Sequence, residues 1–429
     1  MIRVAHFSDL HYGGKTLAEA DRCFGAGIDR AIELGVDAAV ISGDATDHAL
    51  DLHAPAARRL AEQVRRLADH CPVLLLQGTF SHEPPGTLSL MRLLGGRFAV
   101  HVAGRIQQVA LTDDRRWRAS LSWRFETLPN GCMALFTCVP AVNKAVVAAT
   151  MGAVEAPQAV GDRLSALLRG FASINDAARA AGVATVGVSH GTVFGCLSEH
   201  GVPMAGFDHE FTTGALFAAH AQAFLLGHIH RHQGWRQDGQ HGSQAIAYAG
   251  SIGRFHHGEE GDKGFLLWTV EPCAAAYRLE PTPARRTIDI TFEGRPDLKR
   301  IEEVVAEQEI CGASVRVRWT VADEDRGTVD RAAIEALLSG AADVRLEARI
   351  VPVARQRAAG VSRLSSLADK VRAWCRVADV SPAPMLSCLN SIEAVEPEAI
   401  AERVLRSEVG EGTASVPEPC EVAPLAVGH

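Results

Sequence analysis

Aspartate and histidine residues stand at the ends of apolar runs at five places in this sequence. The five segments are Asp9-Leu10-His11, Gly43-Asp44, Gly78-Thr79-Phe80-Ser81-His82-Glu83, Ser189-His190-Gly191 and Gly227-His228-Ile229-His230. Carboxylate oxygens combined with imidazole nitrogens suit Mn, Fe or Zn. Hydrolysis of a phosphate ester near neutral pH needs a strong nucleophile and relief of developing negative charge. Two metal ions roughly 3.5–4 Å apart supply both, so the segments point to two-metal phosphoester chemistry.

The local spacing of these residues fits metal ligation. Asp9 and His11 are two residues apart, so at an extended strand end they point to the same side, and His228 and His230 repeat this spacing. Asp44 follows a buried strand, where a bridging carboxylate would be placed. Each segment alone is weak evidence, since Gly43-Asp44 is more often a turn and His190 could be a satisfied buried histidine. All five together, each after a strand, favour a dimetal site.

The elements before these segments alternate between strands and helices. We expect strands at 2–7, 36–42 and 72–76 and helices at 18–34 and 54–69, which indicates βαβ units. In such sheets ligands bind at the loops beyond the carboxyl ends of the strands. Further strands are expected at 98–102, 106–111, 133–139, 183–188, 222–226, 245–249 and 264–269, with a long helix near 160–181. This spacing suits a layered sheet sandwich with helices outside.

The order of the five segments resembles the calcineurin-like metallophosphoesterase superfamily, whose pattern is D-x-H, GD, GNH(D/E), H and GHxH. The resemblance covers about residues 1–270 and implies an α/β fold, a four-layer α/β/β/α sandwich. It also implies two divalent metal ions, for which we expect Mn²⁺. One ion would be held by Asp9, His11, Asp44 and His230. The other would be held by Asp44, a side chain before His82, His190 and His228, and His82 would donate a proton to the leaving oxygen.

One segment departs from this pattern, because the chain has no Gly-Asn-His. Aligning the segment on His82-Glu83 puts Ser81 in the place of the asparagine, and aligning it on Gly78 puts Thr79 there. We predict Ser81 as the ligand, with Thr79 or water as the alternatives. A hydroxyl is a shorter and poorer neutral ligand than a carboxamide, so we expect weaker binding of the second ion.

Sequence after the last histidine pair resembles one branch of this superfamily. The segments 248–255, Gly258-Glu259-Glu260 and Lys263-Gly264-Phe265 are similar to those of SbcD-type DNA repair nucleases. This resemblance implies a DNA exonuclease, and possibly an endonuclease, that forms a homodimer and works with an SMC-like SbcC-type ATPase. The alternative is a plain strand–turn–strand.

The composition divides the chain into four parts. A phosphoesterase domain is expected at 1–280, before the short linker Glu280-Pro281-Thr282-Pro283, and an α+β capping domain at 285–352. On the strand at 314–319, Arg316 and Arg318 share one face, which either meets DNA phosphates or is simply solvated. A helical partner-binding segment is expected at 353–408, with helices over the apolar stripe and at 397–406, and a disordered tail at 409–429. The stripe consists of Leu364, Leu367, Ala368, Val371, Trp374 and Cys375, and it could bind the ATPase or pack on the cap.

Charge and composition limit the function. The formal net charge of −8 is unlike that of proteins that grip nucleic acid alone, so DNA contact would need a local patch, the metals or a partner. The sequence has no ATP-binding P-loop motif and no membrane span, and the ten scattered cysteines and the absence of a signal peptide predict a cytoplasmic protein. Two alternatives to a nuclease stay open: a small-molecule phosphodiesterase or phosphatase, and a non-catalytic scaffold for the ATPase.

Overall fold

The protein is described from a computed structural model. The structure describes residues 1–51, 53–141, 156–204, 210–259, 261–352, 360–393 and 395–408. The chain divides into two compact units. One comprises Met1–Val321 and Gly327–Arg349, and the other comprises Ala322–Arg326 and the chain from Ile350 onward.

The first half of the large unit is built from βαβ repeats. Strands β1 (Ile2–Phe7), β2 (Ala38–Ile41), β3 (Val73–Leu76) and β4 (Val100–Ala103) are parallel neighbours. Helices α1 (Leu17–Glu33) and α2 (Pro55–Ala68) connect the first three. Proline at the first position of α2 suits a helix start, because its missing N–H would have no partner there. These elements match the expected strands and helices within a few residues.

The second half adds the strands on the other side of the centre. It contains β5 (Gln107–Thr112), β6 (Trp117–Ala119), β7 (Cys132–Val139), β8 (Ala184–His190), β11 (Ala223–Gly227), β12 (Gln233–Gly239) and β13 (Gly242–Tyr248), with helices α4 (Ala156–Ala180) and α5 (Thr213–Phe217). Strands β14 (Gly264–Glu271) and β15 (Ala274–Pro281) then return beside β1. The short strands β9 (Thr192–Val193) and β10 (Glu210–Phe211) pair separately. Strands β6, β12 and β15 were not expected from the sequence.

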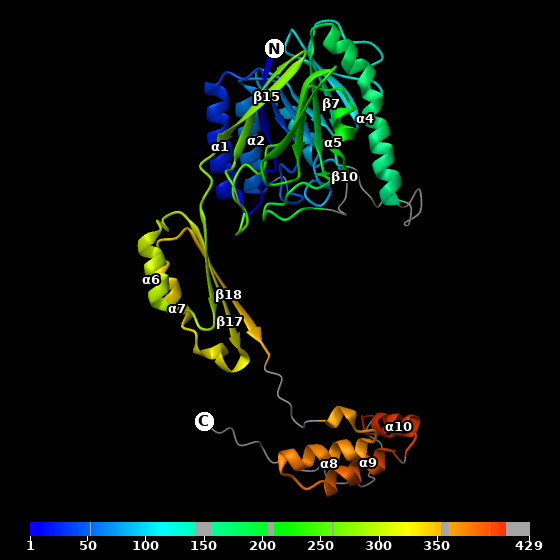
Figure 1. The fold of residues 1–429 in the computed structure, drawn as a ribbon, viewed down its shortest axis with the longest axis vertical. Coiled ribbons are helices and arrows are strands. Elements are labelled where there is room, and N and C mark those ends of the chain that lie inside the picture. The colour runs from blue at the N-terminus through cyan, green and yellow to red at the C-terminus, as the bar shows by residue number, and fades with distance from the viewer. Residues whose placement is uncertain are drawn as a thin grey trace. The chain divides into compact units, whose positions relative to one another are not determined.

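Side chains of the central strands enter two different cores, which makes the unit layered. On β2, Ala38 and Val40 face a core shared with β8, whereas Ala39 and Ile41 face α1 and α2. On the other side, Phe224 and Leu226 of β11 pack with α4 and α5. Hydrogen bonds join thirteen of the described strands into one continuous sheet. The two halves of this sheet meet where Ser243 of β13 pairs with Ala274 of β15. The order helix, sheet, sheet, helix confirms the α/β fold class (Figure 1).

An α+β module follows the sandwich within the same unit. Strands β16 (Thr287–Glu293), β17 (Ser314–Ala322) and β18 (Asp343–Val351) form its sheet in that order, and helices α6 (Leu298–Glu307) and α7 (Arg331–Leu337) lie between them in sequence. Aspartates cap both helices, because Asp297 accepts the N–H of Lys299 and Asp330 that of Ala333. The strands and helices follow one another in the order expected for 285–352, and a separate capping domain there stays a prediction.

The second unit is helical. It contains α8 (Leu367–Ala378), α9 (Ala383–Glu393) and α10 (Pro397–Glu408). Cys375 of the expected apolar stripe is buried and its Sγ lies 3.7 Å from Sδ of Met385 on α9, a helix that was not predicted. Residues 353–359 and the expected disordered tail at 409–429 lie outside the described residues. Among the described helices, none has both the length and the apolar character that a membrane span requires.

Candidate metal centre

The loops that carry the predicted ligands have strained backbones. Among the described residues, seven other than glycine have positive φ, and four of these are predicted ligands. These four are Asp9 (φ 49°), His11 (47°), Asp44 (49°) and His228 (98°). Such conformations cost about 1–3 kcal/mol each and persist only where the surrounding structure enforces them. Their concentration at strand ends makes this edge of the sandwich the candidate functional site.

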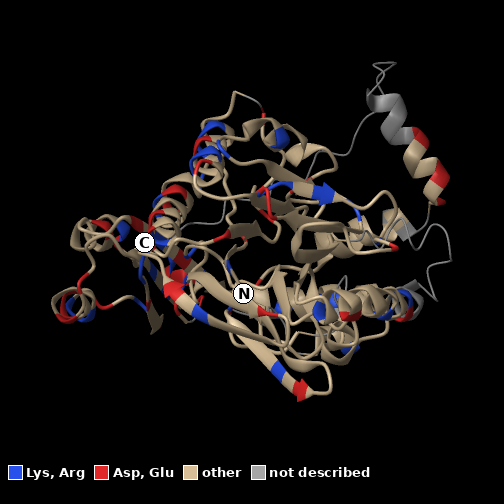
Figure 2. Cartoon of the chain, turned by 90° about the horizontal axis from the view of Figure 1, so that it is seen from above, with Lys and Arg blue, Asp and Glu red and all other residues tan. Residues whose placement is uncertain are grey.

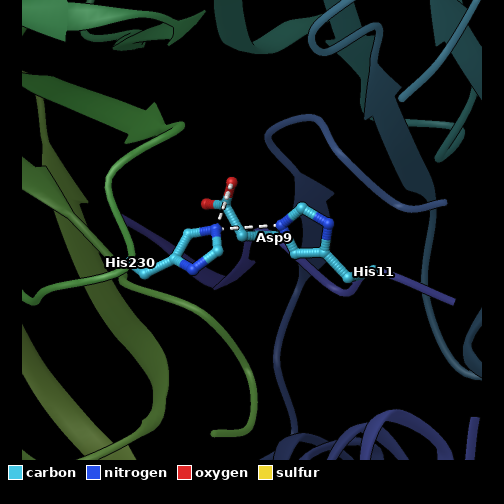
Figure 3. A group of neighbouring side chains, drawn as sticks. All are labelled: Asp9, His11 and His230. Atoms are coloured by element: carbon cyan, nitrogen blue, oxygen red, sulfur yellow. Dashed lines mark hydrogen bonds and ion pairs between the residues drawn. The ribbon is translucent and has the colours of Figure 1, made fainter. Parts of the chain in front are cut away.

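Asp9, His11 and His230 form the first group of potential ligands (Figure 3). The Nε2 atoms of His11 and His230 are 2.9 Å apart, and His230 Nε2 lies 4.0 Å from Oδ1 of Asp9. Hydrogen bonds fix the carboxylate of Asp9, which accepts the backbone N–H of His228 and the hydroxyl of Ser8. Three side chains from two loops thus converge on one point.

The distance between the two imidazoles fits a shared cation. Two nitrogens bound to one metal at about 2.1 Å and at a right angle would be about 3.0 Å apart. Burial lowers the pKa of His230 well below its usual value, so its ring is neutral, as a ligand must be. The residues therefore suit a divalent metal ion.

Asp44, His190 and His228 form the second group. Oδ2 of Asp44 lies 3.2 Å from Nε2 of His190, and the rings of His190 and His228 are 5.3 Å apart between centroids. His190 is oriented by its other nitrogen, which donates to the carbonyl oxygen of Ser42 at 2.8 Å. This backbone contact fixes Nε2 as the nitrogen that faces Asp44, the arrangement typical of histidine metal ligands.

The electrostatics show that this second group favours positive charge. Burial alone would raise the pKa of Asp44, but His190 and other neighbouring imidazoles hold it well below its usual range. Burial alone would lower the pKa of His190, but Asp44 raises it to about 9. The Asp44 carboxylate therefore draws positive charge into this group.

Two glycines allow the site loops to approach one another. A Cβ on Gly43, whose φ is 104°, would lie 2.2 Å from Nδ1 of His190. A Cβ on Gly227 would lie 2.3 Å from the carbonyl oxygen of Ser42 and 2.4 Å from Oγ of Ser8. Both glycines precede a predicted ligand, so their missing side chains are what brings those ligands together.

His82, the predicted proton donor, lies at the edge of the first group. Its ring is 4.9 Å from that of His11 between centroids, and its side chain is one-third exposed. Nδ1 of His82 lies 2.5 Å from the carbonyl oxygen of Asp47, to which it donates. The hydrogen bond leaves Nε2 as the nitrogen available to a substrate.

The turn that contains His82 is braced by a buried carboxylate. Glu83 accepts the backbone N–H of Gly78 at 2.6 Å and that of Ala45 at 2.5 Å. It therefore ties the third segment to the loop that carries Asp44. Burial, followed by the effect of Asp44, raises the pKa of Glu83 to about 7.

Thr79, rather than Ser81, lies in the second group, which corrects the prediction of Ser81. The hydroxyl of Thr79 is 3.0 Å from Oδ2 of Asp44 and 3.1 Å from Nε2 of His190, whereas Ser81 is exposed. The reason is a tight turn in which the carbonyl oxygen of Thr79 accepts the N–H of both His82 and Glu83. Thr79 stays at the strand end while the rest of the segment turns outward.

Two residues of the site were missed from the sequence. Oδ1 of Asp47 lies 3.6 Å from Nδ1 of His11, and the neighbouring His11 imidazole lowers the pKa of Asp47 to about 2. His256 stacks on His230 with the rings 6.3 Å apart between centroids. The signal for Asp47 was its position three residues after Asp44 in the same loop. No sequence signal pointed to His256, apart from its place in the segment after β13.

We expect substitution of Thr79 by valine to weaken binding of one of two Mn²⁺ ions by about tenfold. Valine keeps the shape of threonine but removes the hydroxyl that contacts Asp44 and His190. Calorimetric titration with Mn²⁺ measures the change. Ser81→Ala is the matched control and should bind as the wild type does. If Ser81→Ala loses the ion and Thr79→Val keeps it, the assignment of Thr79 is wrong.

Both arginines predicted to contact DNA are paired with acids of their own sheet. Arg316 donates to the two carboxylate oxygens of Asp289 at 2.6 and 2.9 Å. Arg318 lies 3.9 Å from Asp289 and 3.7 Å from Glu347. These cross-strand pairs neutralise the charge that a phosphate contact would use, so they favour the solvated strand face. A role of the two arginines in DNA binding stays an untested prediction.

No protein-family model and no curated protein matches this chain. A solved structure of a dimetal phosphatase from Danio rerio is similar over 65% of this chain and 98% of that one, at 10% sequence identity and a TM-score of 0.34. A 5'-nucleotidase precursor from Thermus thermophilus is similar over 66% of this chain and 55% of that one, at 15% identity and a TM-score of 0.33.

Proposed function

We propose that this chain is a hydrolase of phosphoesters that uses two divalent metal ions. One observation carries the proposal. Carboxylates and imidazoles from four separate loops at strand ends come together in two groups, and the backbone of these loops is strained. Asp9, His11 and His230 would hold one ion, and Asp44, His190 and His228 the other, with Asp44 reaching both. When bound, the ions supply a hydroxide nucleophile and neutralise phosphate oxygens.

Side chains of the protein would act on the leaving oxygen and orient the metal ligands. His82 would face the leaving oxygen with Nε2, because Nδ1 donates to the carbonyl oxygen of Asp47 and the ring is partly exposed; proton donation there would require a proton on both ring nitrogens. Asp47 also faces Nδ1 of His11, so one residue orients both histidines. Thr79 and Ser42 fix Asp44 and His190 through hydrogen bonds.

We propose DNA as the substrate, on the basis of a cleft beside the metal centre. The cleft is about 520 Å³ and is lined by Asp47 and His256 on the metal side and by Lys15, Arg254 and Arg345 among others. Arg254 donates to backbone carbonyls, those of Arg285 at 2.9 Å and Gly261 at 2.6 Å, rather than to an acid. Its charge is therefore available to a phosphodiester backbone, unlike that of Arg316.

The overall charge supports a role within a larger assembly. Lys and Arg occur on the same helices and strands as Asp and Glu (Figure 2), and the net charge is −8. A chain with this balance gains little non-specific affinity for DNA. We propose that it acts as an SbcD-type homodimer, with an SMC-like ATPase bound to the helical unit. The apolar residues Leu367 and Val377 of α8 are 57% and 61% exposed and could meet such a partner.

A small-molecule phosphodiesterase or phosphatase is the second candidate. The observation that favours it is the same negative balance, together with Asp47 and Asp343 in the lining of the cleft. These carboxylates would repel a long polyanion more than a small ester.

A substrate panel with purified protein and Mn²⁺ tests the proposal. We expect cleavage of single- or double-stranded DNA and of bis-p-nitrophenyl phosphate, and loss of both activities with EDTA. Intact DNA beside rapid cleavage of small esters would support the second candidate. No cleavage by protein that has bound Mn²⁺ would instead support a non-catalytic scaffold.

Two arginine variants sharpen this panel. We expect Arg254→Gln to reduce DNA cleavage more than cleavage of the small ester. We also expect the slope of DNA affinity against salt concentration to fall by about the amount that one phosphate contact contributes. Arg318→Gln is the matched control, because Arg318 already faces two acids. Equal behaviour of the two variants on DNA would contradict the role of the cleft.

A further inference from the structure

A chain of hydrogen bonds runs from the core of the sandwich to Asp9. Nε1 of Trp268 on β14 lies 3.4 Å from Nδ1 of His6 on β1, and Nε2 of His6 lies 2.8 Å from Oγ of Ser42. Oγ of Ser42 lies 2.9 Å from Oγ of Ser8, which lies 2.5 Å from Oδ2 of Asp9. Five residues from β1, from the loops after β1 and β2 and from β14 are thus joined in sequence.

The two ends of this chain fix the direction in which every hydrogen bond donates. An indole N–H can only donate, so Nδ1 of His6 accepts and its proton is on Nε2. His6 therefore donates to Ser42, Ser42 to Ser8, and Ser8 to Asp9. An ionised carboxylate can only accept, so the chain ends at Asp9 without conflict.

Burial keeps this arrangement intact. All five side chains belong to fully buried residues. Burial lowers the pKa of His6 to about 3, so the ring is neutral near neutral pH. The other acceptor within reach of Ser42 is the carbonyl oxygen of Phe7 at 3.4 Å, which is farther than Ser8. In a site closed to water, aligned hydrogen bonds of this kind polarise and strengthen one another.

Asp9 depends on these contacts because no Lys or Arg among the described residues forms an ion pair with it. Its carboxylate accepts from Ser8 and from the N–H of His228, which lies 3.1 Å from both oxygens. We infer that His6, Ser42 and Ser8 act as positioning residues, forming a relay that holds the Asp9 carboxylate in place for a divalent cation. This inference rests on the proposed function, in which Asp9 is a metal ligand.

Variants of His6 distinguish the effect of the hydrogen-bond relay from an effect of core packing. His6→Leu removes both hydrogen bonds of the ring. His6→Gln keeps their direction, since the amide oxygen can accept from Trp268 and the amide N–H can donate to Ser42. Ser8→Ala, a small change, removes the last donor if His6→Leu fails to fold.

The probe is Mn²⁺ alone, titrated into the metal-free chain and followed by calorimetry and by electron paramagnetic resonance. We expect His6→Leu and Ser8→Ala to weaken one of the two ions by about 10- to 100-fold, the range for residues behind a metal ligand. The other ion should keep its affinity, and His6→Gln should bind within about threefold of the wild type. A packing defect would weaken both ions together and would not be restored by glutamine.

Three outcomes overturn the inference. The first is wild-type Mn²⁺ binding by His6→Leu and Ser8→Ala, and the second is equal weakening of both ions in all three variants. The third is a proton on Nδ1 of His6. Nitrogen NMR of the metal-free protein should show a neutral ring with its proton on Nε2, and a proton on Nδ1 would mean that His6 neither accepts from Trp268 nor donates to Ser42. If the wild type binds fewer than two ions, the proposed function fails and the role of the relay toward a cation fails with it. The NMR result distinguishes that case from a relay that is absent.

Discussion

Substitution of Asp44 by asparagine is expected to lower kcat/KM for phosphoester hydrolysis by about 10³-fold or more. Asparagine has the shape of aspartate; its amide oxygen can still accept the N–H of Thr79, and its amide N–H can donate to the hydroxyl of Thr79, so the loop should keep its fold. The substitution removes the charge that raises the pKa of His190 and that would attract the proposed cations. The loss should therefore appear in metal binding as well as in turnover.

Thermal unfolding with and without Mn²⁺ separates these effects. The wild type should gain stability as Mn²⁺ exceeds its dissociation constant, because the ions bind only the folded state. Asp44→Asn should unfold at about the wild-type temperature without metal and gain little when Mn²⁺ is added. Asp51→Asn is the matched control, since Asp51 is exposed seven residues farther along. An Asp44→Asn variant with wild-type turnover would exclude Asp44 from the centre.

Substitution of Gly78 by alanine is expected to destroy the centre through the backbone. A Cβ at position 78 would lie 2.2 Å from the backbone nitrogen of Asp44 and 2.2 Å from its Oδ1. The backbone nitrogen cannot move aside as a flexible side chain could, so the two loops must separate. We expect a loss of about 1–3 kcal/mol in the free energy of unfolding and loss of tight binding of both Mn²⁺ ions.

Gly14→Ala provides the control for this second change. Gly14 follows the Asp9–His11 segment closely, but a Cβ there would meet nothing within 4 Å. Denaturant unfolding and Mn²⁺ titration should give wild-type values for Gly14→Ala and reduced values for Gly78→Ala. Wild-type Mn²⁺ binding by a folded Gly78→Ala variant would show that the loops do not need this close approach.

The positions of the predicted ligands could be anticipated because they follow from strand ends. Buried runs such as Val73–Leu76 can be recognised from their composition alone, and parallel strands bring their carboxyl ends to one edge. Asp9 and Asp44 come within three residues of the end of such a run and His190 ends one, so the sequence places them at one edge of the sheet, and the strained turns and glycines of the loops then bring them together.

Details that depend on turns and on strand pairing could not be anticipated. Thr79 and Ser81 are equivalent by spacing, and only the hydrogen bonds of one turn place Thr79 inward. The neutralisation of Arg316 depends on a register that pairs it with Asp289 across two strands. Asp47 was overlooked because its contact with His11 crosses between loops.

Elements without a clear pattern were also missed. Strand β15 carries polar and apolar residues in a half-buried sequence, yet it joins the two halves of the large sheet. Helix α9 has a proline near its start and is only weakly amphipathic, so its sequence does not indicate a helix. Its packing against Cys375 of α8 stabilises it.

Anomalous diffraction from crystals soaked in Mn²⁺ would show directly whether two cations bind where the strand ends converge. We expect two anomalous peaks about 3.5–4 Å apart. One should contact Asp9, His11 and His230, and the other His190 and His228, with Asp44 between them. Crystals that show no peak there, or a single ion elsewhere with these imidazoles turned away from one another, would contradict this expectation.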